Sequence, residues 1–171
     1  YNSKGSEKDK PSTPKQMIAL LHFGRSGTGL LHSLIDNHNG LSTLPSIYFS
    51  EYFNDTVWSS LTAQGWDDLP ERFVEQFAVL FDANSPVPVP SISKPLANLG
   101  KKEGMANVGE HKDEVLVVDK SIFCSELKQL MGGYSKLGPK DFFDLVHLAY
   151  DRALNSTTEK QTIFYHIHNP S

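Results

Sequence analysis

Apolar residues near the start of the chain change their spacing within a few positions. Met17–Phe23 is almost continuously apolar, with His22 as the exception, and a glycine follows it. A short run of this kind is typical of a strand buried on both faces of a parallel sheet. Helical spacing then begins at Thr28 and runs to Asn37, with its apolar positions at Leu30, Leu31, Leu34 and Ile35. The sequence therefore predicts a strand, a glycine-rich turn and a helix in direct succession.

The following segment is aromatic, and a second helix comes after it. The aromatic residues of 41–66 suit a core or, alternatively, the wall of an acceptor pocket, and we favour the core: Tyr48, Phe49, Tyr52, Phe53, Trp58 and Trp66. Asp68 can cap a helix in which Pro70 suits the first turn and Glu71 stands three residues after the cap. We expect this helix to end near Phe81 and to bury Phe73, Phe77 and Leu80.

Strand and helix patterns alternate again in the second half of the chain. Residues 84–113 are rich in proline and glycine and predict a long irregular segment. Short strands are expected at Val115–Val118 and Thr162–Ile167. One helix should end at Met131 before a glycine pair, with Ser121 as its N-cap, and another should run from Lys140 to about Leu154. This alternation predicts an α/β fold with a parallel sheet flanked by helices.

Composition limits the partners that the chain can take. A net charge of −4 gives no global positive field for nucleic acid or an anionic membrane, so an anion site has to be local. We expect no membrane span, because no apolar run approaches about 20 residues, and no signal peptide, because residues 1–16 are polar and charged. The single cysteine, Cys124, excludes an internal disulfide and fits a reducing, cytoplasmic location. Residues 1–16 predict a flexible linker, and residues 17–171 predict one domain.

The turn after the first strand has the composition of an anion-binding loop. Its sequence is Gly24-Arg25-Ser26-Gly27-Thr28-Gly29. Glycines let an anion approach the backbone amides at a helix N-terminus, where the helix dipole also favours negative charge. Arg25 adds a planar, charged donor suited to phosphate or sulfate. The Walker pattern fails because Leu30 and Leu31 follow the last glycine, and the glycine order also differs from the dinucleotide fingerprint.

A third pattern fits the segment "FGRSGTGLLHSLIDNH". It resembles the phosphosulfate-binding loop of sulfotransferases that use 3′-phosphoadenosine 5′-phosphosulfate, in particular through Arg25-Ser26-Gly27-Thr28 and Leu30-Leu31. The continuation "LSTLPSIYFSEYF" is similar to bacterial members of that family. The resemblance covers about residues 17–53 and is fainter at 115–121 and 162–171. It implies a P-loop-like parallel sheet flanked by helices.

The resemblance also implies a co-substrate and its binding residues. The phosphosulfate would lie against Gly24, Arg25, Ser26, Gly27, Thr28, Gly29 and Leu30, with Lys120 reaching it from the end of the second strand. Arg25 would stabilise charge on the leaving nucleotide, because donors aimed at developing charge are the largest usual catalytic contribution. The reaction requires no metal, and the sequence offers no convincing set of metal ligands. Lys120 is equally ordinary as a solvated lysine.

The general base is chosen from several candidates. His168 is the first choice, because the carboxyl ends of parallel strands hold the ligands of such sheets. His166, on the same face of that strand, is the second, and Glu51 is the alternative that some family members suggest. His168 could equally be a strand-end residue that only packs. His32, on the loop helix, is interpreted as structural, and His22, His111 and His147 have no supporting context.

One expected element of the family is missing. The strand ending in arginine that holds the 3′-phosphate is not found, since "HNPS" has its proline without the arginine. We therefore expect the domain to be incomplete at its C-terminus and to belong to a larger polypeptide. The acceptor, a small molecule or a carrier or carbohydrate, stays open. The alternatives are a divergent P-loop phosphotransferase and a non-catalytic binding or scaffold domain that keeps the fold.

Overall fold

The computed structural model describes most of the chain. The described residues are 11–22, 26–36, 38–45, 49–85, 110–111, 113–156, 158 and 160–168. At His22, Ser50, Glu51 and His168 the description covers the backbone alone. Gly24 and Arg25 of the predicted anion loop therefore lie outside the described residues, as do Tyr48 and most of the irregular segment 84–113.

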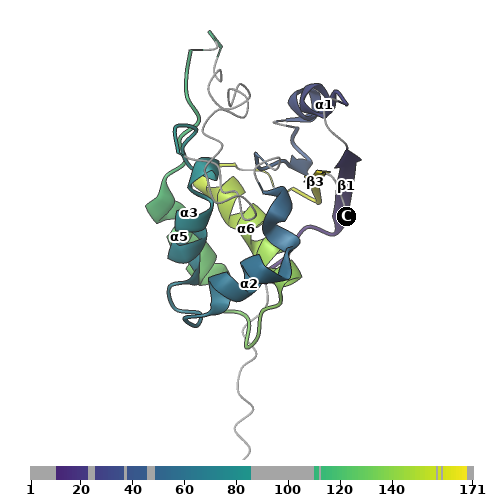
Figure 1. The fold of residues 1–171 in the computed structure, drawn as a ribbon. Coiled ribbons are helices and arrows are strands. Elements are labelled where there is room, and N and C mark those ends of the chain that lie inside the picture. Colours follow the sequence, from purple (N-terminus) through teal and green to yellow (C-terminus); the bar gives the residue numbers. More distant parts are fainter. Residues whose placement is uncertain are drawn as a thin grey trace, which may run out of the picture.

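A parallel sheet and several helices make up the described part of the fold (Figure 1). The strands are β1 (Gln16–His22), β2 (Leu41–Ser42) and β3 (Thr162–His168), in the order β1-β3-β2 and all parallel. The helices are α1 (Thr28–Ile35), α2 (Asp55–Thr62), α3 (Leu69–Gln76), α5 (Lys120–Met131) and α6 (Pro139–Ala153). Two short 3-10 turns, η2 (Ser50–Phe53) and η3 (Ala78–Leu80), complete the list. The predicted α/β class with a parallel sheet flanked by helices is confirmed.

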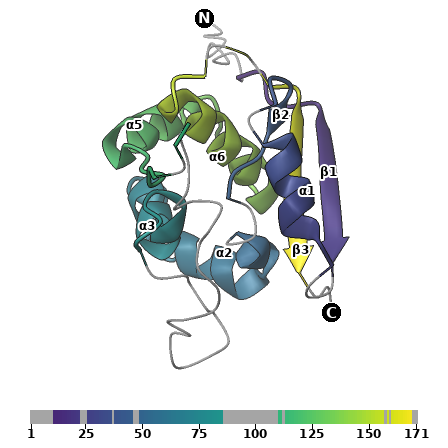
Figure 2. The ribbon, with the colours of Figure 1, turned by 90° about the horizontal axis from the view of Figure 1, so that it is seen from above.

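Alternate residues of the central strand β3 face different helices, as the two-residue period of a strand requires. The Phe164 ring lies 6.1 Å from the ring of His32 on α1. The Tyr165 ring, one position on, lies 5.3 Å from Phe143 on α6. The sheet is thus covered by α1 on one face and by α6 on the other, and Figure 2 shows α2, α3 and α5 gathered on the α6 side.

The core lies mainly among the helices on the α6 side of the sheet. Its centre is aromatic: Phe49 stacks on Phe143 with ring centroids 5.2 Å apart, and Phe73 meets Phe49 edge-on at 5.5 Å. Phe49 and Tyr52 are buried, so the core interpretation of the aromatic segment is confirmed there. Phe53 and Trp66 are each 42% exposed and lie at the margin.

The predicted burial of the first strand on both faces is wrong, and the apolar positions of the first helix are mostly exposed. In β1, Ile18 is 48% and Leu21 57% exposed, because β1 pairs only with β3 among the described residues and forms the sheet edge. In α1 the leucines at positions 30, 31 and 34 are all exposed. The half-buried side of this helix carries Thr28, His32 and Ile35 instead. The spacing of the apolar residues predicted the helix correctly, but the polar side chain of His32 occupies the centre of its inner face.

The strand predicted at Val115–Val118 is also wrong. This segment is outside the parallel sheet and forms one isolated antiparallel bridge, between Val117 and Asp82. The Val118 amide donates to the Phe81 carbonyl at 2.8 Å, so the segment is paired with the chain that follows η3. Val115 and Val117 are 40% and 66% exposed, respectively. Four apolar residues are too few to distinguish a core strand from a half-exposed connection.

Side-chain caps fix the starts of two helices. At α5 the cap is Asp119, whose Oδ1 accepts from the amides of Ser121 at 2.8 Å and Ile122 at 3.0 Å, so the expectation that Ser121 caps this helix is wrong. A carboxylate one residue outside the helix satisfies two first-turn amides at once. Helix α2, which the sequence pattern did not reveal, begins after Asn54, whose side chain accepts from the Thr56 amide at 3.0 Å.

Candidate functional site

The turn between β1 and α1 has the backbone geometry of an open helix N-terminus. Gly27 is the N-cap of α1 and has φ 76° and ψ 9°, in the left-handed region that favours glycine. It provides no side-chain cap, and a Cβ at Gly27 or Gly29 would meet nothing within 4 Å. Ser26 and Gly29 are exposed. The first turn of α1 is therefore accessible to an external group, and its amides suit an anion.

The carboxyl ends of β1 and β3 lie side by side. Their parallel register pairs Leu20 with His166 and His22 with His168. The backbone of His168 therefore stands next to the point where the chain leaves β1 for the predicted anion loop. The predicted neighbourhood of strand end and loop is present, while the side chain of His168 is outside the described part of the structure.

A histidine pair joins the inner side of α1 to the sheet. His32 Nδ1 lies 2.7 Å from His166 Nε2, and the two rings are tilted with centroids 4.9 Å apart. His166 is 1% exposed. Burial lowers the pKa of His32, and the negative charge of Asp36 partly opposes that shift. Because His166 is enclosed and bonded to His32, its burial argues against the second-choice role as a base that contacts the acceptor.

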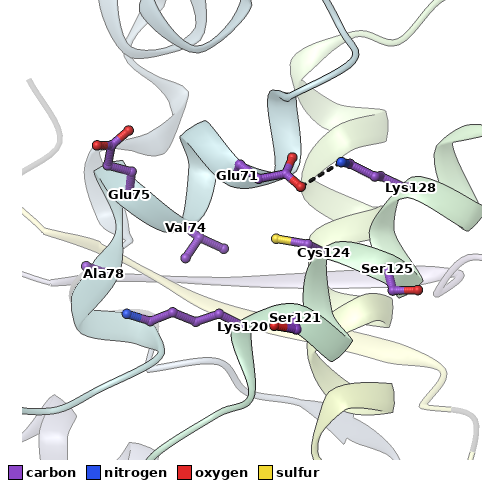
Figure 3. Close-up of a pocket in the computed structure, with 9 residues that line it drawn as sticks. All are labelled: Glu71, Val74, Glu75, Ala78, Lys120, Ser121, Cys124, Ser125 and Lys128. Atoms are coloured by element: carbon purple, nitrogen blue, oxygen red, sulfur yellow. Dashed lines mark ion pairs between the residues drawn. The ribbon is translucent and has the colours of Figure 1, made fainter.

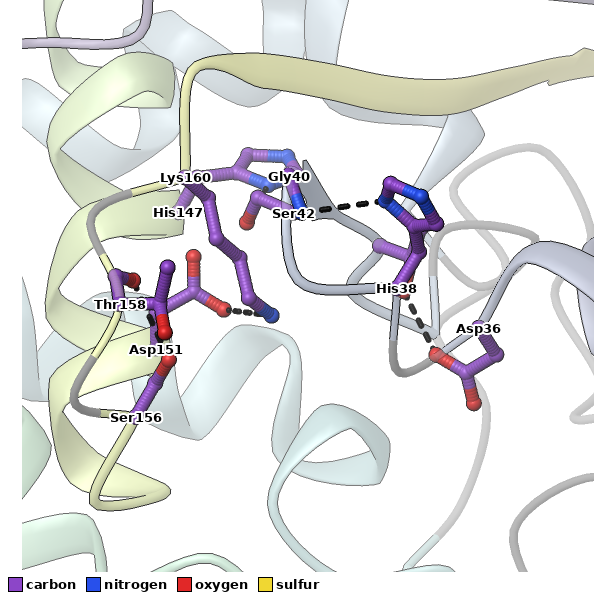
Figure 4. Close-up of polar contacts among 10 residues, drawn as sticks. Asp36, His38, Gly40, Ser42, His147, Asp151, Ser156, Thr158 and Lys160 are labelled. Carbon is purple, nitrogen blue, oxygen red and sulfur yellow. Dashed lines mark hydrogen bonds and ion pairs between the residues drawn. The ribbon is translucent and has the colours of Figure 1, made fainter.

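The other end of α1 has a separate tether. Thr43 Oγ1, just after β2, donates to Asp36 Oδ1 at 2.6 Å. Figure 4 shows Asp36 apart from the cluster around His147. Helix α1 is thus joined to the rest of the fold by polar contacts at its middle and at its C-terminal end.

A second polar cluster is buried on the opposite face of the sheet. Ser42 Oγ lies 2.9 Å from His147 Nδ1, and Lys160 Nζ lies 2.8 Å from Asp151 Oδ1 (Figure 4). Ser42 is also hydrogen-bonded to Asp151. His147 is fully buried, and its Nε2 has no partner among the described residues. Burial, assisted by the charge of Lys160, lowers the pKa of His147 to about 3. The ring is therefore neutral at ordinary pH, and the enclosed cluster can stabilise the fold but cannot reach a substrate.

Lys120 lines a groove between α3 and α5 (Figure 3). Glu75 and Ala78 stand on one side of that groove, with Lys120 and Cys124 on the other. The expectation that Lys120 ends a sheet strand fails together with the strand at 115–118, since Lys120 opens α5 instead. Glu71 and Lys128 form an ion pair across the groove at 2.6 Å. Burial raises the pKa of the Cys124 thiol, so the cysteine is not activated there.

The remaining expectations concern Glu51, metals and the membrane. Glu51 lies in η2, and this turn contacts β3 through the rings of Phe53 and Tyr165, whose centroids are 5.9 Å apart. The side chain of Glu51 is outside the described part of the structure. Within the described ranges, His, Cys, Asp and Glu side chains form no group of three that could hold a metal ion. Within the same ranges, no helix has both the length and the apolar character needed to cross a membrane.

Sequence reasoning missed the partners of the buried histidines. His32 is correctly interpreted as structural, but its pairing with His166 joins residues far apart in the chain. His147 has no motif around it, and only its position on the inner side of the last predicted helix could have indicated burial.

The fold and the turn define a class of architecture: a parallel α/β sheet with a glycine-capped helix at the carboxyl end of an outer strand. Comparison with known proteins adds no relative, since no protein-family model, curated protein or solved structure matches this chain.

Proposed function

We propose that this chain is the phosphosulfate-binding part of a sulfotransferase that uses 3′-phosphoadenosine 5′-phosphosulfate. The observation that carries the proposal is the left-handed, side-chain-free cap at Gly27, directly after β1 and at the open start of α1. Such a turn favours an anion whose oxygens reach backbone amides. The motif Arg25-Ser26-Gly27-Thr28 supports a phosphosulfate over a triphosphate, because the lysine and the hydroxyl of a Mg²⁺-nucleotide loop are missing.

The proposed reaction is direct sulfuryl transfer to a hydroxyl or amine. The acceptor heteroatom attacks sulfur as the bond from sulfur to the bridging oxygen breaks, and 3′-phosphoadenosine 5′-phosphate leaves. Arg25 and the amides of the turn stabilise the charge that grows on the bridging oxygen. The acceptor proton passes to His168, or to Glu51 if His168 only packs. The reaction needs no metal, and we expect it in the cytoplasm, where Cys124 stays reduced.

The parallel register of β1 and β3 supports the choice of His168. Because His168 pairs with His22, its backbone stands at the same edge of the sheet as the anion loop. His166, two residues earlier, is enclosed and bonded to His32, which leaves His168 as the histidine of β3 that is positioned at the rim. Lys120 has a weaker claim as a phosphosulfate ligand, because it begins α5 and lines the α3–α5 groove. No residue of this chain is assigned to the 3′-phosphate, so we propose that the chain works within a larger polypeptide.

Calorimetric titration separates this proposal from its alternatives. The chain is titrated with 3′-phosphoadenosine 5′-phosphate, which it should hold by the 5′-phosphate at the Gly27 turn even without a site for the 3′-phosphate, and, separately, with Mg-ATP. Binding of the first ligand that is lost in Arg25→Ala supports the sulfotransferase, and Lys136→Ala serves as the control because it removes an exposed positive charge elsewhere. Binding of Mg-ATP alone would favour a phosphotransferase. Binding of neither would overturn the proposal in favour of a non-catalytic scaffold.

A further inference from the structure

Helix α1 is attached to the sheet in an unusual way for an amphipathic helix. None of its residues is fully buried, and its leucines at positions 30, 31 and 34 face away from the sheet. Its half-buried side consists of Thr28, His32 and Ile35. A helix of this kind gains little from apolar burial, which is normally the main source of helix stability in a protein. Its position therefore depends strongly on polar contacts.

The contact at the middle of α1 is the hydrogen bond between two imidazoles. His32 Nδ1 and His166 Nε2 are 2.7 Å apart, so one ring donates its N–H and the other accepts with its lone pair. His166 is held in the central strand and is 1% exposed, which makes it a fixed anchor. Phe164 adds an edge contact to the His32 ring at 6.1 Å.

We propose that His32 and His166 form a positioning pair that holds α1, and with it the anion-binding turn at Gly27, on the sheet, and that protonation of both rings releases it. The neutral pair has one donor and one acceptor, and a singly protonated pair keeps both. When both rings are protonated, each facing nitrogen carries a proton, the lone pair is lost and two positive charges meet. The hydrogen bond then gives way to repulsion between the two rings. The claim that this release also weakens anion binding at Gly27 rests on the proposed function.

The groups around the pair set the direction of this response. Burial lowers the pKa of His32, so its ring is neutral near neutral pH and the pair loses its bond only on acidification. From α1, Asp36 opposes that shift through its negative charge, as does the backbone of Thr43. On α6, burial raises the pKa of Tyr150, and the negative charge of Asp36 raises it further. The described side chains of β1 and the residues of β2 add no ionisable group.

Amide hydrogen exchange measures the release without any ligand. In the full chain, protection of the amides from Leu31 to Asp36 is compared with protection in α6 at about pH 7.5 and about pH 4, the lower value being chosen because burial lowers the pKa of His32. We expect α1 protection, corrected for intrinsic exchange, to fall about tenfold relative to α6 on acidification. Unchanged α1 protection across that range would overturn the proposal.

Two substitutions of His32 make the test specific. His32→Asn keeps an amide near the position of Nδ1, and an amide offers both a donor and an acceptor, so the contact survives protonation of His166. We expect α1 protection in His32→Asn to be independent of pH. His32→Leu removes the contact, and α1 protection should be low at both pH values. A response that persists in His32→Asn, or full protection in His32→Leu, would contradict the positioning role.

A matched control and a ligand titration separate this inference from the proposed function. Thr43→Val removes the other tether of α1, at Asp36, and should leave the pH response in place. Titration with 3′-phosphoadenosine 5′-phosphate at both pH values should show weaker binding at the lower pH in wild type, and less difference in His32→Asn. If the nucleotide never binds while α1 protection still follows pH, the proposed function fails and the positioning pair stands. If it binds and α1 protection ignores pH, the positioning pair fails.

Discussion

Ser42 on β2 and His147 on α6 are hydrogen-bonded from Oγ to Nδ1 at 2.9 Å, at a place where both side chains are almost fully buried. This bond connects the sheet to the helix that covers it. Because the ring of His147 is enclosed, protonating it would place a charge where water cannot solvate it. Protonation of this imidazole in acid therefore opposes folding.

The first prediction is that His147 makes the chain less stable in acid. Its folded pKa is lowered to about 3, whereas an exposed histidine titrates near about 6.5. Between these values the unfolded chain binds a proton that the folded chain does not. The contribution of His147 to the free energy of unfolding is therefore fully present above the unfolded pKa and is lost as the pH drops toward 3. Each unit of pKa difference is worth about 1.4 kcal/mol.

Urea unfolding at a series of pH values tests this dependence. His147→Leu should lose stability at neutral pH through the broken contact with Ser42, and should show a shallower decline in acid than wild type. His111→Gln, at an exposed histidine, is the control and should keep the wild-type slope. If His147→Leu declines as steeply as wild type, other groups govern the acid sensitivity.

The second prediction concerns the ion pair beside that histidine. Lys160 and Asp151 lie 2.8 Å apart, with side chains only 14% and 11% exposed. Removing the lysine leaves a carboxylate that water hardly reaches, so Lys160→Met should destabilise the fold by about 3 kcal/mol at neutral pH. Burial raises the pKa of Asp151, and the cost should shrink in acid as the carboxyl is neutralised.

A chemically similar pair provides the control. Lys128 and Glu71 are 2.6 Å apart, and their side chains are 45% and 47% exposed. Water can therefore solvate the carboxylate that is left behind, and Lys128→Met should cost clearly less than Lys160→Met. Equal losses in the two variants, measured by chemical denaturation, would show that burial of the carboxylate does not determine the effect.

The sequence was sufficient for the first strand and helix and for the last helix and strand, because each of these elements has a clear period and an end signal. The strand at Met17, the turn at Gly27 and the helix after it follow from apolar spacing and glycine positions. The same holds for the last helix and strand. These features are local, so a single sequence contains the information that specifies them.

The contacts that position the candidate site could not be predicted in the same way. The pairs His32–His166 and Ser42–His147 join side chains from distant parts of the chain, and nothing in their local sequence marks them. The exposed leucines of α1 could not be predicted from local sequence either, because apolar spacing identifies a helix without showing which of its faces meets the sheet. At Val117 a short apolar run was insufficient to distinguish a core strand from an exposed bridge.

The third prediction is that Arg25 supports the chemical step. In the protein that carries the proposed activity, Arg25→Ala should lower the rate of sulfuryl transfer about a hundredfold, the usual scale for a lost donor to developing charge. Arg25→Lys should recover part of that rate, since it restores the charge without the planar fork. Transfer of ³⁵S from labelled co-substrate measures the rate. Wild-type activity in Arg25→Ala would remove the residue from the mechanism.

The fourth prediction separates backbone conformation from ligand contact at the turn. Gly27 and Gly65 have φ values of 76° and 87°, and an added Cβ would meet no atom within 4 Å at either residue. An alanine at each position therefore adds backbone strain alone, worth about 1–2 kcal/mol. Gly27→Ala and Gly65→Ala should lose similar stability in chemical denaturation, while only Gly27→Ala should weaken binding of 3′-phosphoadenosine 5′-phosphate, because only Gly27 caps α1. Equal binding by the two variants would mean that the anion does not rest on this turn, even though the helix begins there.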